Sequence, residues 1–586
     1  MIKQHIEGLI QQAFAKLTQD GKISVDLPQV QIDNTKDKQH GDYACNIALI
    51  LAKAIQKKPR ELAEWIVDSL PTSPMIAKVE IAGPGFINFF LSNTALHNVI
   101  PDILQKKSDY GKVNIGKDKK IIVEFVSCNP TGPLHVGHGR HGAYGAVVSN
   151  LLEKIGYIVY REYYVNDAGR QMDILSVSVW LRYLGLLGEK FIFPVNAYKG
   201  AYVTDIAKLL IEKKGNQFLA AKEKILADLP KDEPEGGDKE VYIDAVIARA
   251  KELLSESNFI WMLNLSLESI LTDIRSDLAE FGVEFNEWFS ERAFVQTDAV
   301  DKAIQKLKQS GLLYEKEGAL WFRATDFDDE KDRVLQRANG QRTYFANDLA
   351  YHINKFERGF DFAIDIFGSD HHGYVPRMKA ALQASGIVPD KLTYLLVQFV
   401  TLYRSGNQVQ MSTRSGSFVT LRELREEVGN DAARFFYVMR KCEQHMDFDL
   451  DLAKAQSNEN PVYYIQYAHA RICSVFRQLA EKNWQYQEEE GLKRLDLLTD
   501  SYELQLLGTL SRYNETVKTA AMQYEPYLLT HYLRDLANDF HVYYNSCQFL
   551  VEDSILRNAR LSLISAVRQI LINGLELLGV STPESM

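Results

Sequence analysis

The sequence predicts an α/β protein: a doubly wound, Rossmann-like parallel sheet that carries an insertion, with a small α/β domain before it and an all-α domain after it. Short apolar runs at 121–126 and 362–367 end in glycine- and histidine-rich turns, as is typical of buried parallel strands. Between them, over about 177–327, helical patterns replace the alternation of strand and helix. From residue 460 onward only helical periodicity remains. Together these patterns predict the fold class.

The bulk numbers limit the possibilities only loosely. A chain of 586 residues is too long for one core and predicts several domains. Its composition, 46% hydrophobic and 25% charged, is that of an ordinary globular protein. The net charge of −10 indicates no basic domain, although a local basic stripe is enough for transient RNA binding. No apolar run long enough to span a bilayer is apparent, so no membrane partner is expected.

Cysteine usage favours reduced thiols and a cytoplasmic location, because the five cysteines are scattered. They are Cys45, Cys128, Cys442, Cys473 and Cys547. A zinc site is not expected, since the chain has no Cys-x-x-Cys pair and no histidine-rich partner stretch to complete a ligand set.

Residues 1–92 are expected to form the small α/β domain. Apolar residues at positions 2, 6, 9, 13 and 17 recur at helical spacing and predict an amphipathic first helix. Further helices are expected at 44–55 and 61–70, and strands near 30–32, 79–81 and 86–91.

The stretch 119–155 is predicted to form a strand, a turn and a helix, and it carries the first chemical cluster. Glu124 is the one acid in the strand, and two prolines and a glycine in 128–133 end it. His135 and His138 share one face of the first helical turn, at a helix N-terminus that favours anions. We interpret them as donors to the phosphates of ATP; a zinc pair or two core histidines are the alternatives.

Glycines beside these histidines have a predicted role as well. Gly137 and Gly139 remove side-chain bulk, so that a flat ring or a phosphate could approach the backbone. The next strand is expected at 157–165, and Asn166 or Asp167 after it could cap a helix.

The insertion is expected to be mostly helical. Helical patterns at 203–213, 241–254 and 265–281 surround an acidic stretch at 228–240 that is rich in proline and glycine and is typical of a solvated loop. An insertion of this length would divide the two halves of a doubly wound sheet.

The stretch 343–352 is the second chemical cluster. On a helix, Tyr344, Asp348 and Tyr351 would share one face. A carboxylate flanked by phenols suits a guanidinium, which offers paired planar donors and stacks on aromatic rings. The alternative is a core-facing helix in which Asp348 is capped or paired to Lys355.

A third cluster follows the strand at 362–367. Two strands that both end in glycine and histidine, on opposite sides of the insertion, suit the two halves of one nucleotide site. Adjacent histidines point apart on regular structure, so at most one of His371 and His372 needs to face the ligand; we favour Asp370 and His372.

Residues 130–140, preceded by Ser127, Cys128 and Asn129, resemble the HIGH motif of class I aminoacyl-tRNA synthetases, in the wording of the bacterial arginyl family. The resemblance covers essentially the whole chain in order. It implies an N-terminal tRNA-contacting domain at 1–92, a catalytic domain at 110–455 with the insertion at about 177–327, and an α-helical anticodon-binding domain at 456–586.

The resemblance also implies the reaction. L-Arginine and ATP, with Mg²⁺, would form arginyl-adenylate and pyrophosphate, and the arginyl group would pass to arginine tRNA. The enzyme would be a cytoplasmic monomer. A class I synthetase for another amino acid and a non-catalytic tRNA-binding relative are the alternatives.

Site residues carried over from the resemblance fall into three groups. The catalytic group is His135, His138, Ser412 and Lys120. The ATP-binding group is Asn129, Pro130, Thr131, Gly132, Pro133, Leu134, His135, Val136, Gly137, His138, Met411 and Ser412. The arginine-binding group is Glu124, Ser127, Cys128, Asn129, His138, Tyr344, Asp348, Asp370 and His372.

Residues 410–416 occupy the place of the family's KMSKS loop but depart from its pattern. Gln410 replaces the first lysine and Thr413 the second, which usually binds phosphate. Another cation must then supply that charge. The wider family suggests Lys119 or Lys120, and Arg414 is the rival.

Overall fold

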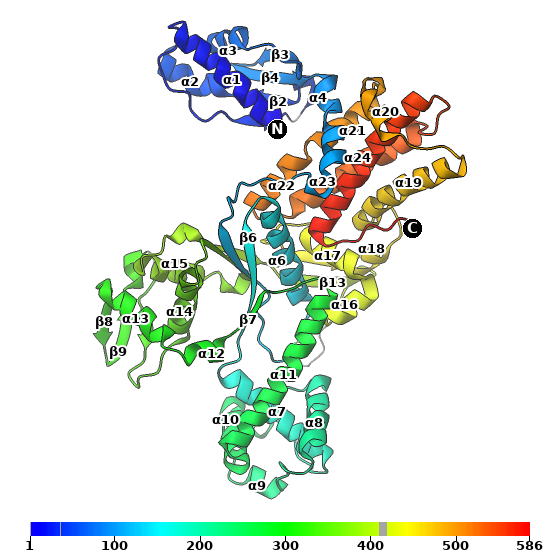
Figure 1. The fold of residues 1–586 in the computed structure, drawn as a ribbon. Helices are drawn as coiled ribbons and strands as arrows, with labels where there is room; N and C mark the ends of the chain where they lie inside the picture. The colour runs from blue at the N-terminus through cyan, green and yellow to red at the C-terminus, as the bar shows by residue number, and fades with distance from the viewer. Residues whose placement is uncertain (1, 36, 328, 410–418) are drawn as a thin grey trace.

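The structure is a computed structural model that describes residues 2–35, 37–327, 329–409 and 419–586. Figure 1 shows a small N-terminal domain at one end, a helical bundle beside it, and a sheet-containing body from which a separate group of helices extends. A five-stranded parallel sheet is the centre of that body, as the fold class predicts.

The N-terminal domain packs its helices on an antiparallel sheet of order β1-β2-β4-β3, with a hydrophobic core of its own. Its elements are α1 (Ile2–Gln19), β1 (Ile32–Asn34), β2 (Tyr43–Cys45), α2 (Ile47–Ile55), α3 (Pro59–Ser69), β3 (Ile76–Ala82) and β4 (Phe86–Leu91). The helix expected from residue 44 begins at Ile47, because β2 takes the residues before it. Helices α4 (Asn93–His97) and α5 (Val99–Lys106) lead to the body.

The catalytic sheet has the order β12-β11-β5-β6-β7, and all of its pairings are parallel. The strands are β5 (Lys120–Glu124), β6 (Ile158–Val165), β7 (Glu287–Ser290), β11 (Phe362–Gly368) and β12 (Leu392–Val397). The two runs predicted as strands, β5 and β11, are direct neighbours in the middle of the sheet. Their turns therefore meet at one edge, as the doubly wound prediction requires.

The expectation of one insertion at about 177–327 is wrong, because β7 returns to the sheet in its middle and pairs with β6. The first excursion holds α7 (Arg170–Leu186), α8 (Ala201–Lys214), α9 (Lys222–Leu226), α10 (Lys239–Leu254) and α11 (Glu256–Glu280). The second holds α12 (Glu291–Val295), α13 (Ala299–Gln309), β8 (Leu313–Lys316), β9 (Ala319–Phe322) and β10 (Arg333–Gln336). A four-residue strand that begins with an acid leaves no apolar run to recognise.

Long helices bring the remaining site residues to the sheet edge. Helix α6 (Val136–Lys154) follows β5, and α14 (Tyr344–Glu357) precedes β11. The elements that follow β11 in this body are α15 (Val375–Ala384), β13 (Val400–Arg404), β14 (Asn407–Gln408), α16 (Leu421–Val428), α17 (Asn430–Val438), β15 (Met446–Asp449) and α18 (Leu450–Lys454).

The C-terminal region is helical, as predicted. It contains α19 (Pro461–Glu481), α20 (Glu488–Lys493), α21 (Ser501–Ser511), α22 (Tyr513–Met522), α23 (Tyr527–Ser546) and α24 (Ser554–Leu578). Within the described residues, α24 alone has the length and apolar composition of a membrane-crossing helix, with a mean hydropathy of 1.4 over 18 residues. This apolar helix differs from the expectation of no such run. Of that window, 72% is buried against the protein, as in a core helix.

Helix α6 joins the body to this helical region. The hydroxyl of Tyr144 donates to the carbonyl of Tyr524 at 2.6 Å, and the Asn150 amide donates to the carbonyl of Leu577 at 2.9 Å. The same helix begins at His135, so one rigid element connects the predicted site to the helical region.

Candidate active site

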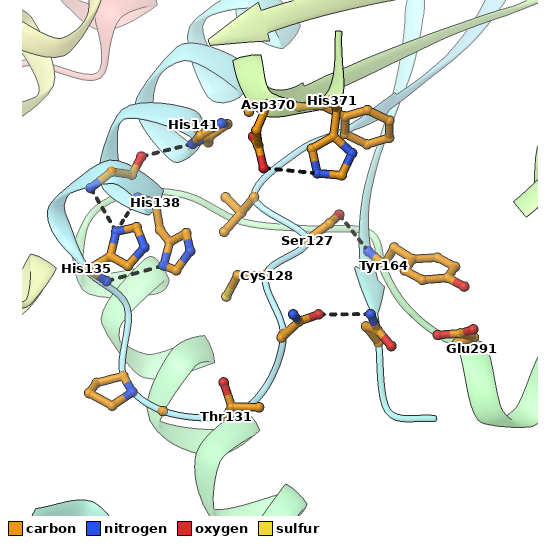
Figure 2. Close-up of a pocket in the computed structure, with 18 of the residues that line it drawn as sticks. Ser127, Cys128, Thr131, His135, His138, His141, Tyr164, Glu291, Asp370 and His371 are labelled. Atoms are coloured by element: carbon orange, nitrogen blue, oxygen red, sulfur yellow. Dashed lines mark hydrogen bonds and ion pairs between the residues drawn. The ribbon is translucent and has the colours of Figure 1, made fainter. Parts of the chain in front are cut away.

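A cavity of about 1460 Å³ lies beyond the carboxyl ends of β5, β6 and β11. It collects residues from the turn after β5, from α14 and from the turn after β11, so the three predicted clusters share one cavity. Figure 2 shows His135 and His138 on one side of this pocket and Glu291 on the other, with Ser127 and Cys128 between them.

The turn after β5 is held in an unusual backbone conformation. Val126 and Ser127 have φ values of 66° and 40°, in the left-handed region that β-branched residues rarely enter. The backbone N–H of Tyr164 donates to Ser127 Oγ at 3.0 Å, and the Asn166 amide donates to Asn129 Oδ1 at 2.9 Å. Strand β6 thus holds a turn whose strain is typical of functional sites.

The two predicted histidines begin α6 and hold each other in place. His135 is the N-cap, and its Nδ1 accepts from the backbone N–H groups of Gly137 at 3.1 Å and His138 at 3.4 Å. His138 Nδ1 accepts from the backbone N–H of His135 at 3.3 Å. The rings stack with centroids 3.5 Å apart. Because both Nδ1 atoms act as acceptors, each neutral ring carries its proton on Nε2.

Burial keeps these imidazoles neutral. It lowers the pKa of His135 to about 4, and it lowers the pKa of His138 well below the usual range, with a contribution from His135. At neutral pH the pair therefore offers neutral N–H donors at a helix N-terminus. This arrangement favours an anion by geometry and not by added positive charge.

Several residues of the predicted ATP-binding run do not line the pocket. Pro130, Leu134 and Val136 are buried and absent from its wall, so their contact with ATP stays a prediction without geometric support. Leu134 and Val136 instead hold the segment before α16: the Leu134 carbonyl accepts from Leu421 at 2.9 Å, and the Val136 N–H donates to Val419 at 3.3 Å.

The role predicted for the two glycines also needs correction. A Cβ on Gly137 would lie 2.9 Å from Cε1 of His135, so this glycine makes room for the imidazole. A Cβ on Gly139 would lie 2.6 Å from the Leu421 side chain and 3.0 Å from Tyr437. Both glycines thus serve packing around the histidines, and Gly137 also lines the pocket.

The opposite side of the pocket is acidic. Asp348 and Tyr344 of α14 line it, as predicted, together with Tyr351, and Tyr344 is 68% exposed at the rim. Lys355 pairs with Glu124 and Asp365, each at 2.6 Å, so the alternative pairing of Asp348 with Lys355 is wrong. Asp348 forms no ion pair with any described residue.

Glu291 is a functional candidate that the sequence did not reveal. It is the first residue of α12, is 3% exposed and lines the same pocket. Burial raises its pKa to about 7, with further contributions from Asp348 and Asp167. Burial also raises the pKa of Asp348, against the effect of His352. Two carboxylates that form no ion pair with any described residue indicate a site for a positively charged ligand.

Asp167 explains why Glu291 is there. Its carboxylate accepts from the Ser290 hydroxyl at 2.6 Å and from the backbone N–H of Arg292 at 2.8 Å. It therefore holds the first turn of α12, whose N-cap is Ser290, and fixes Glu291 beside the pocket. The cap predicted for Asn166 or Asp167 on the helix after β6 is wrong, because that helix, α7, has Gly169 at its N-cap and no side-chain cap.

Positions after β11 divide between two cavities. Asp370 and His371 line the main pocket, whereas His372 lines a separate cavity of about 390 Å³ beside α15. The geometry therefore favours His371 over His372 as the histidine of the main pocket, and contact of either with a ligand stays a prediction. The predicted arginine contacts Glu124, Ser127, Cys128, Asn129 and His138 all line the main pocket.

The structure places Lys120, the predicted substitute for the missing cation, away from the pocket. Lys120 is the first residue of β5, at the amino end of the strand, whereas the pocket begins at Glu124 at the carboxyl end. The pocket cations are Lys199, Lys239 and Arg377. Lys239 pairs with Glu233 at 3.3 Å, while Lys199 forms no ion pair with any described residue. Met411, Ser412 and the other loop positions at 410–418 lie outside the described residues.

Lys199 belongs to a segment that contacts the turn after β5. Tyr202, three residues later, donates from its hydroxyl to the Thr131 carbonyl at 2.5 Å, and its ring would lie 3.1 Å from a Cβ on Gly132. This contact could not be predicted from the sequence, because the two segments are far apart in the chain. Among the described residues, no group of three or more His, Cys, Asp or Glu side chains could hold a metal ion.

Family models match most of the chain. The arginyl-tRNA synthetase N-terminal domain matches residues 4–91. The catalytic domain of class I (R) tRNA synthetases matches 99–185 and 246–461, and the DALR anticodon-binding domain matches 465–586. The arginine–tRNA ligase of Thioalkalivibrio sulfidiphilus is 60% identical over 586 residues and 100% of both chains. The chain belongs to the class I arginyl-tRNA synthetases.

As a member of this family, the protein is an enzyme that ligates arginine to tRNA. The arginine–tRNA ligase of Legionella pneumophila is 58% identical, again over 100% of both chains. A solved structure of a putative arginyl-tRNA synthetase from Campylobacter jejuni has 32% identity and a TM-score of 0.73, and covers 85% of this chain and 100% of that chain. The Thermus thermophilus structure, with 23% identity and a TM-score of 0.73 over 100% of both chains, shows the shared fold.

Proposed function

We propose that the acidic side of the pocket binds the guanidinium of L-arginine and that the stacked imidazoles bind the phosphates of ATP. One observation carries this proposal. Asp348 and Glu291 form no ion pair with any described residue, and they line the same cavity as His135 and His138. A guanidinium can donate to two carboxylates at once and stack on Tyr344. Lysine, with a single ammonium, matches this geometry less well.

The acidic side of the pocket and the imidazoles on the other side would orient arginine for reaction. With its guanidinium at Asp348 and Glu291, its α-carboxylate would point toward Asn129 of the turn after β5 and His138 of α6. A carboxylate oxygen attacks the α-phosphorus of ATP, the bond to the β-phosphate breaks, and pyrophosphate leaves. Arginyl-adenylate remains in the pocket. The Nε2–H donors of His135 and His138 stabilise the charge that develops on the phosphate oxygens.

ATP enters as its magnesium complex, with the ion held mainly by phosphate oxygens and water. The protein then needs no dedicated metal cluster. In the second step a hydroxyl of the 3′-terminal ribose of arginine tRNA attacks the adenylate carbonyl, and AMP and a proton leave. The helical region matching the DALR domain would hold the anticodon arm, and the N-terminal domain would contact another part of the tRNA, in the cytoplasm where translation occurs.

Pyrophosphate exchange with each of the twenty amino acids tests the proposal. We expect exchange with arginine alone, near background without tRNA and raised by arginine tRNA, since the family resemblance implies that the RNA completes the site. Exchange with lysine comparable to that with arginine would contradict the assignment of Asp348 and Glu291. Full exchange without tRNA would contradict the requirement for RNA.

A further inference from the structure

The turn after β5 is held from two sides. Strand β6 holds its first half, through hydrogen bonds to the side chains of Ser127 and Asn129. Its second half, Thr131 and Gly132, contacts the first excursion, at Tyr202 in the first turn of α8. Because the turn contains residues in strained backbone conformations, it keeps its shape only while its surroundings restrain it.

Tyr202 contacts this turn with both its hydroxyl group and its ring. The hydroxyl donates to the Thr131 carbonyl at 2.5 Å. A Cβ on Gly132 would lie 3.1 Å from the ring carbon Cζ, and a Cβ on Gly200 would lie 2.3 Å from Cε1. Two glycines therefore leave the space that the ring fills. Burial raises the pKa of the phenol, so the hydroxyl keeps its proton and remains a donor at neutral pH.

The segment that carries Tyr202 is fixed to the rest of the excursion. The backbone N–H of Val195 donates to Asp232 Oδ2 at 3.0 Å, and that of Tyr198 donates to Ser178 Oγ at 2.9 Å. Both acceptor residues, Asp232 and Ser178, are buried. Tyr202 therefore joins the turn to a body of packed helices and not to a free loop.

The excursion forms one wall of the main pocket. Residues 195–202 all line the cavity that holds the stacked imidazoles, and the start of α10 lines it as well. The model of the catalytic domain matches 99–185 and 246–461, so this wall lies between its two matched parts. The match to the family therefore gives no role to Tyr202.

We propose that Tyr202 is a positioning residue that docks the first excursion on the turn after β5 and fixes Thr131 and Gly132 for the reaction of ATP. It acts through the backbone of the turn, because its hydroxyl donates to the Thr131 carbonyl. The turn leads directly into His135 at the start of α6, so a shift at Thr131 also displaces the imidazoles. The inference rests on the proposed assignment of this end of the pocket to ATP.

Tyr202→Phe removes the hydrogen bond and keeps the ring. In pyrophosphate exchange with arginine tRNA present, we expect kcat/KM for ATP to fall by about tenfold, because a small displacement of the turn weakens the stabilisation of the transition state. The arginine KM should stay close to the wild-type value, since the acidic side of the pocket is built from α12 and α14. An unchanged kcat/KM for ATP would overturn the proposal.

Tyr183→Phe is the matched control. Tyr183 of α7 also donates from its hydroxyl to a backbone carbonyl of the same excursion, that of Gly215 at 2.7 Å, but it does not line the pocket. This variant should lower the thermal unfolding midpoint at least as much as Tyr202→Phe does, yet leave kcat/KM for ATP within about twofold. Equal losses of kcat/KM in the two variants would indicate a merely structural role and overturn the proposal.

Gly132→Ala tests the contact between the turn and the ring. The added methyl group would press on the ring of Tyr202, so kcat/KM for ATP should fall by about fivefold. In a Tyr202→Ala background the ring is gone, and Gly132→Ala should then cost less than about twofold. The same cost in both backgrounds would mean that Tyr202 does not act on the turn, and would also overturn the proposal.

His135→Ala distinguishes failure of this inference from failure of the site assignment. The proposed function requires this variant to lower kcat for adenylate formation. If it leaves exchange unchanged, ATP binds elsewhere and the assignment itself is wrong. If it lowers exchange while Tyr202→Phe leaves kcat/KM for ATP intact, only the role of Tyr202 is refuted.

Discussion

The two ends of the pocket are built on opposite electrostatic principles. The end proposed for the nucleotide consists of a turn and two stacked imidazoles whose pKa values burial lowers, so it offers an anion neutral N–H donors. The end proposed for arginine consists of Glu291 and Asp348, so it offers a cation two carboxylates whose pKa values burial raises. The comparison teaches that one end is organised by geometry and the other by charge.

The substitution Asp348→Asn tests this difference between the two ends most directly. An amide cannot form the charged fork with a guanidinium, and stranding one partner of a buried charge pair costs about 2–5 kcal/mol. We expect a greatly raised KM for arginine and an unchanged KM for ATP, measured in exchange with arginine tRNA present. Equal changes in both constants would mean that Asp348 supports the fold and not the ligand.

His135→Ala and His138→Ala address the nucleotide end. Each should lower kcat for adenylate formation, by about 2–4 kcal/mol in transition-state stabilisation, with little change in the arginine KM. Because the rings hold each other, the two losses should not add. His372→Ala is the control, since this side chain lines a different cavity; a loss as large in that variant would contradict the placement of the site.

The pH dependence of the arginine KM and of the ATP KM should distinguish the two ends of the pocket without any substitution. Arginine needs an ionised Glu291, and its own guanidinium stays charged, so protonation of Glu291 competes with binding. With a pKa of about 7 in the empty protein, the arginine KM should be flat above about pH 8 and rise about tenfold per unit below about pH 6. The ATP KM should stay level over this range, because the imidazoles are already neutral. A flat arginine profile would contradict the raised pKa.

Glu291→Gln supplies the matched variant for that profile. It should raise the arginine KM at pH 8 and flatten the dependence between about pH 6 and 8. If the arginine KM of this variant depends on pH as steeply as that of the wild type, a group other than Glu291 titrates.

The smallest expected effect concerns the cation at the nucleotide end. Lys199 lies in the pocket wall and Lys120 at the opposite end of its strand. A hydrogen bond to a charged phosphate contributes about 1.5–3 kcal/mol, so Lys199→Ala should lower kcat/KM for ATP by roughly tenfold. Lys120→Ala should change it by less than about twofold. A larger loss of kcat/KM in Lys120→Ala than in Lys199→Ala would support Lys120 as the cation, as the family resemblance implies.

How far the sequence could predict the site depended on how many segments build each part. The turn and the histidines at 127–138 are contiguous, so pattern and position revealed them together. Tyr344 and Asp348 could be found because a helix repeats predictably. Glu291 could not be found, since it follows a four-residue strand and is placed by Asp167, about 120 positions earlier in the chain.

The errors have the same origin. Lys120 was close to the histidines in sequence, but a strand separates them and parallel topology puts its two ends on opposite edges of the sheet. The sequence could not show that His371, and not His372, lines the main pocket, because the chain after β11 forms a short turn whose side-chain directions are not periodic. The partners of Lys355 required strand register, which a single sequence does not specify for parallel strands.

Helix α6 gives the active site mechanical leverage. About 22 Å of helix separate His135, in the pocket, from Asn150, whose amide is anchored to the carbonyl of Leu577 in the helical region. A tilt of about 3° around that anchor would swing His135 by about 1 Å. Misplacement on this scale can change a reaction rate by about a hundredfold. A shift of the helical region too small to alter its own packing is therefore large enough to bring the imidazoles into line or take them out of it.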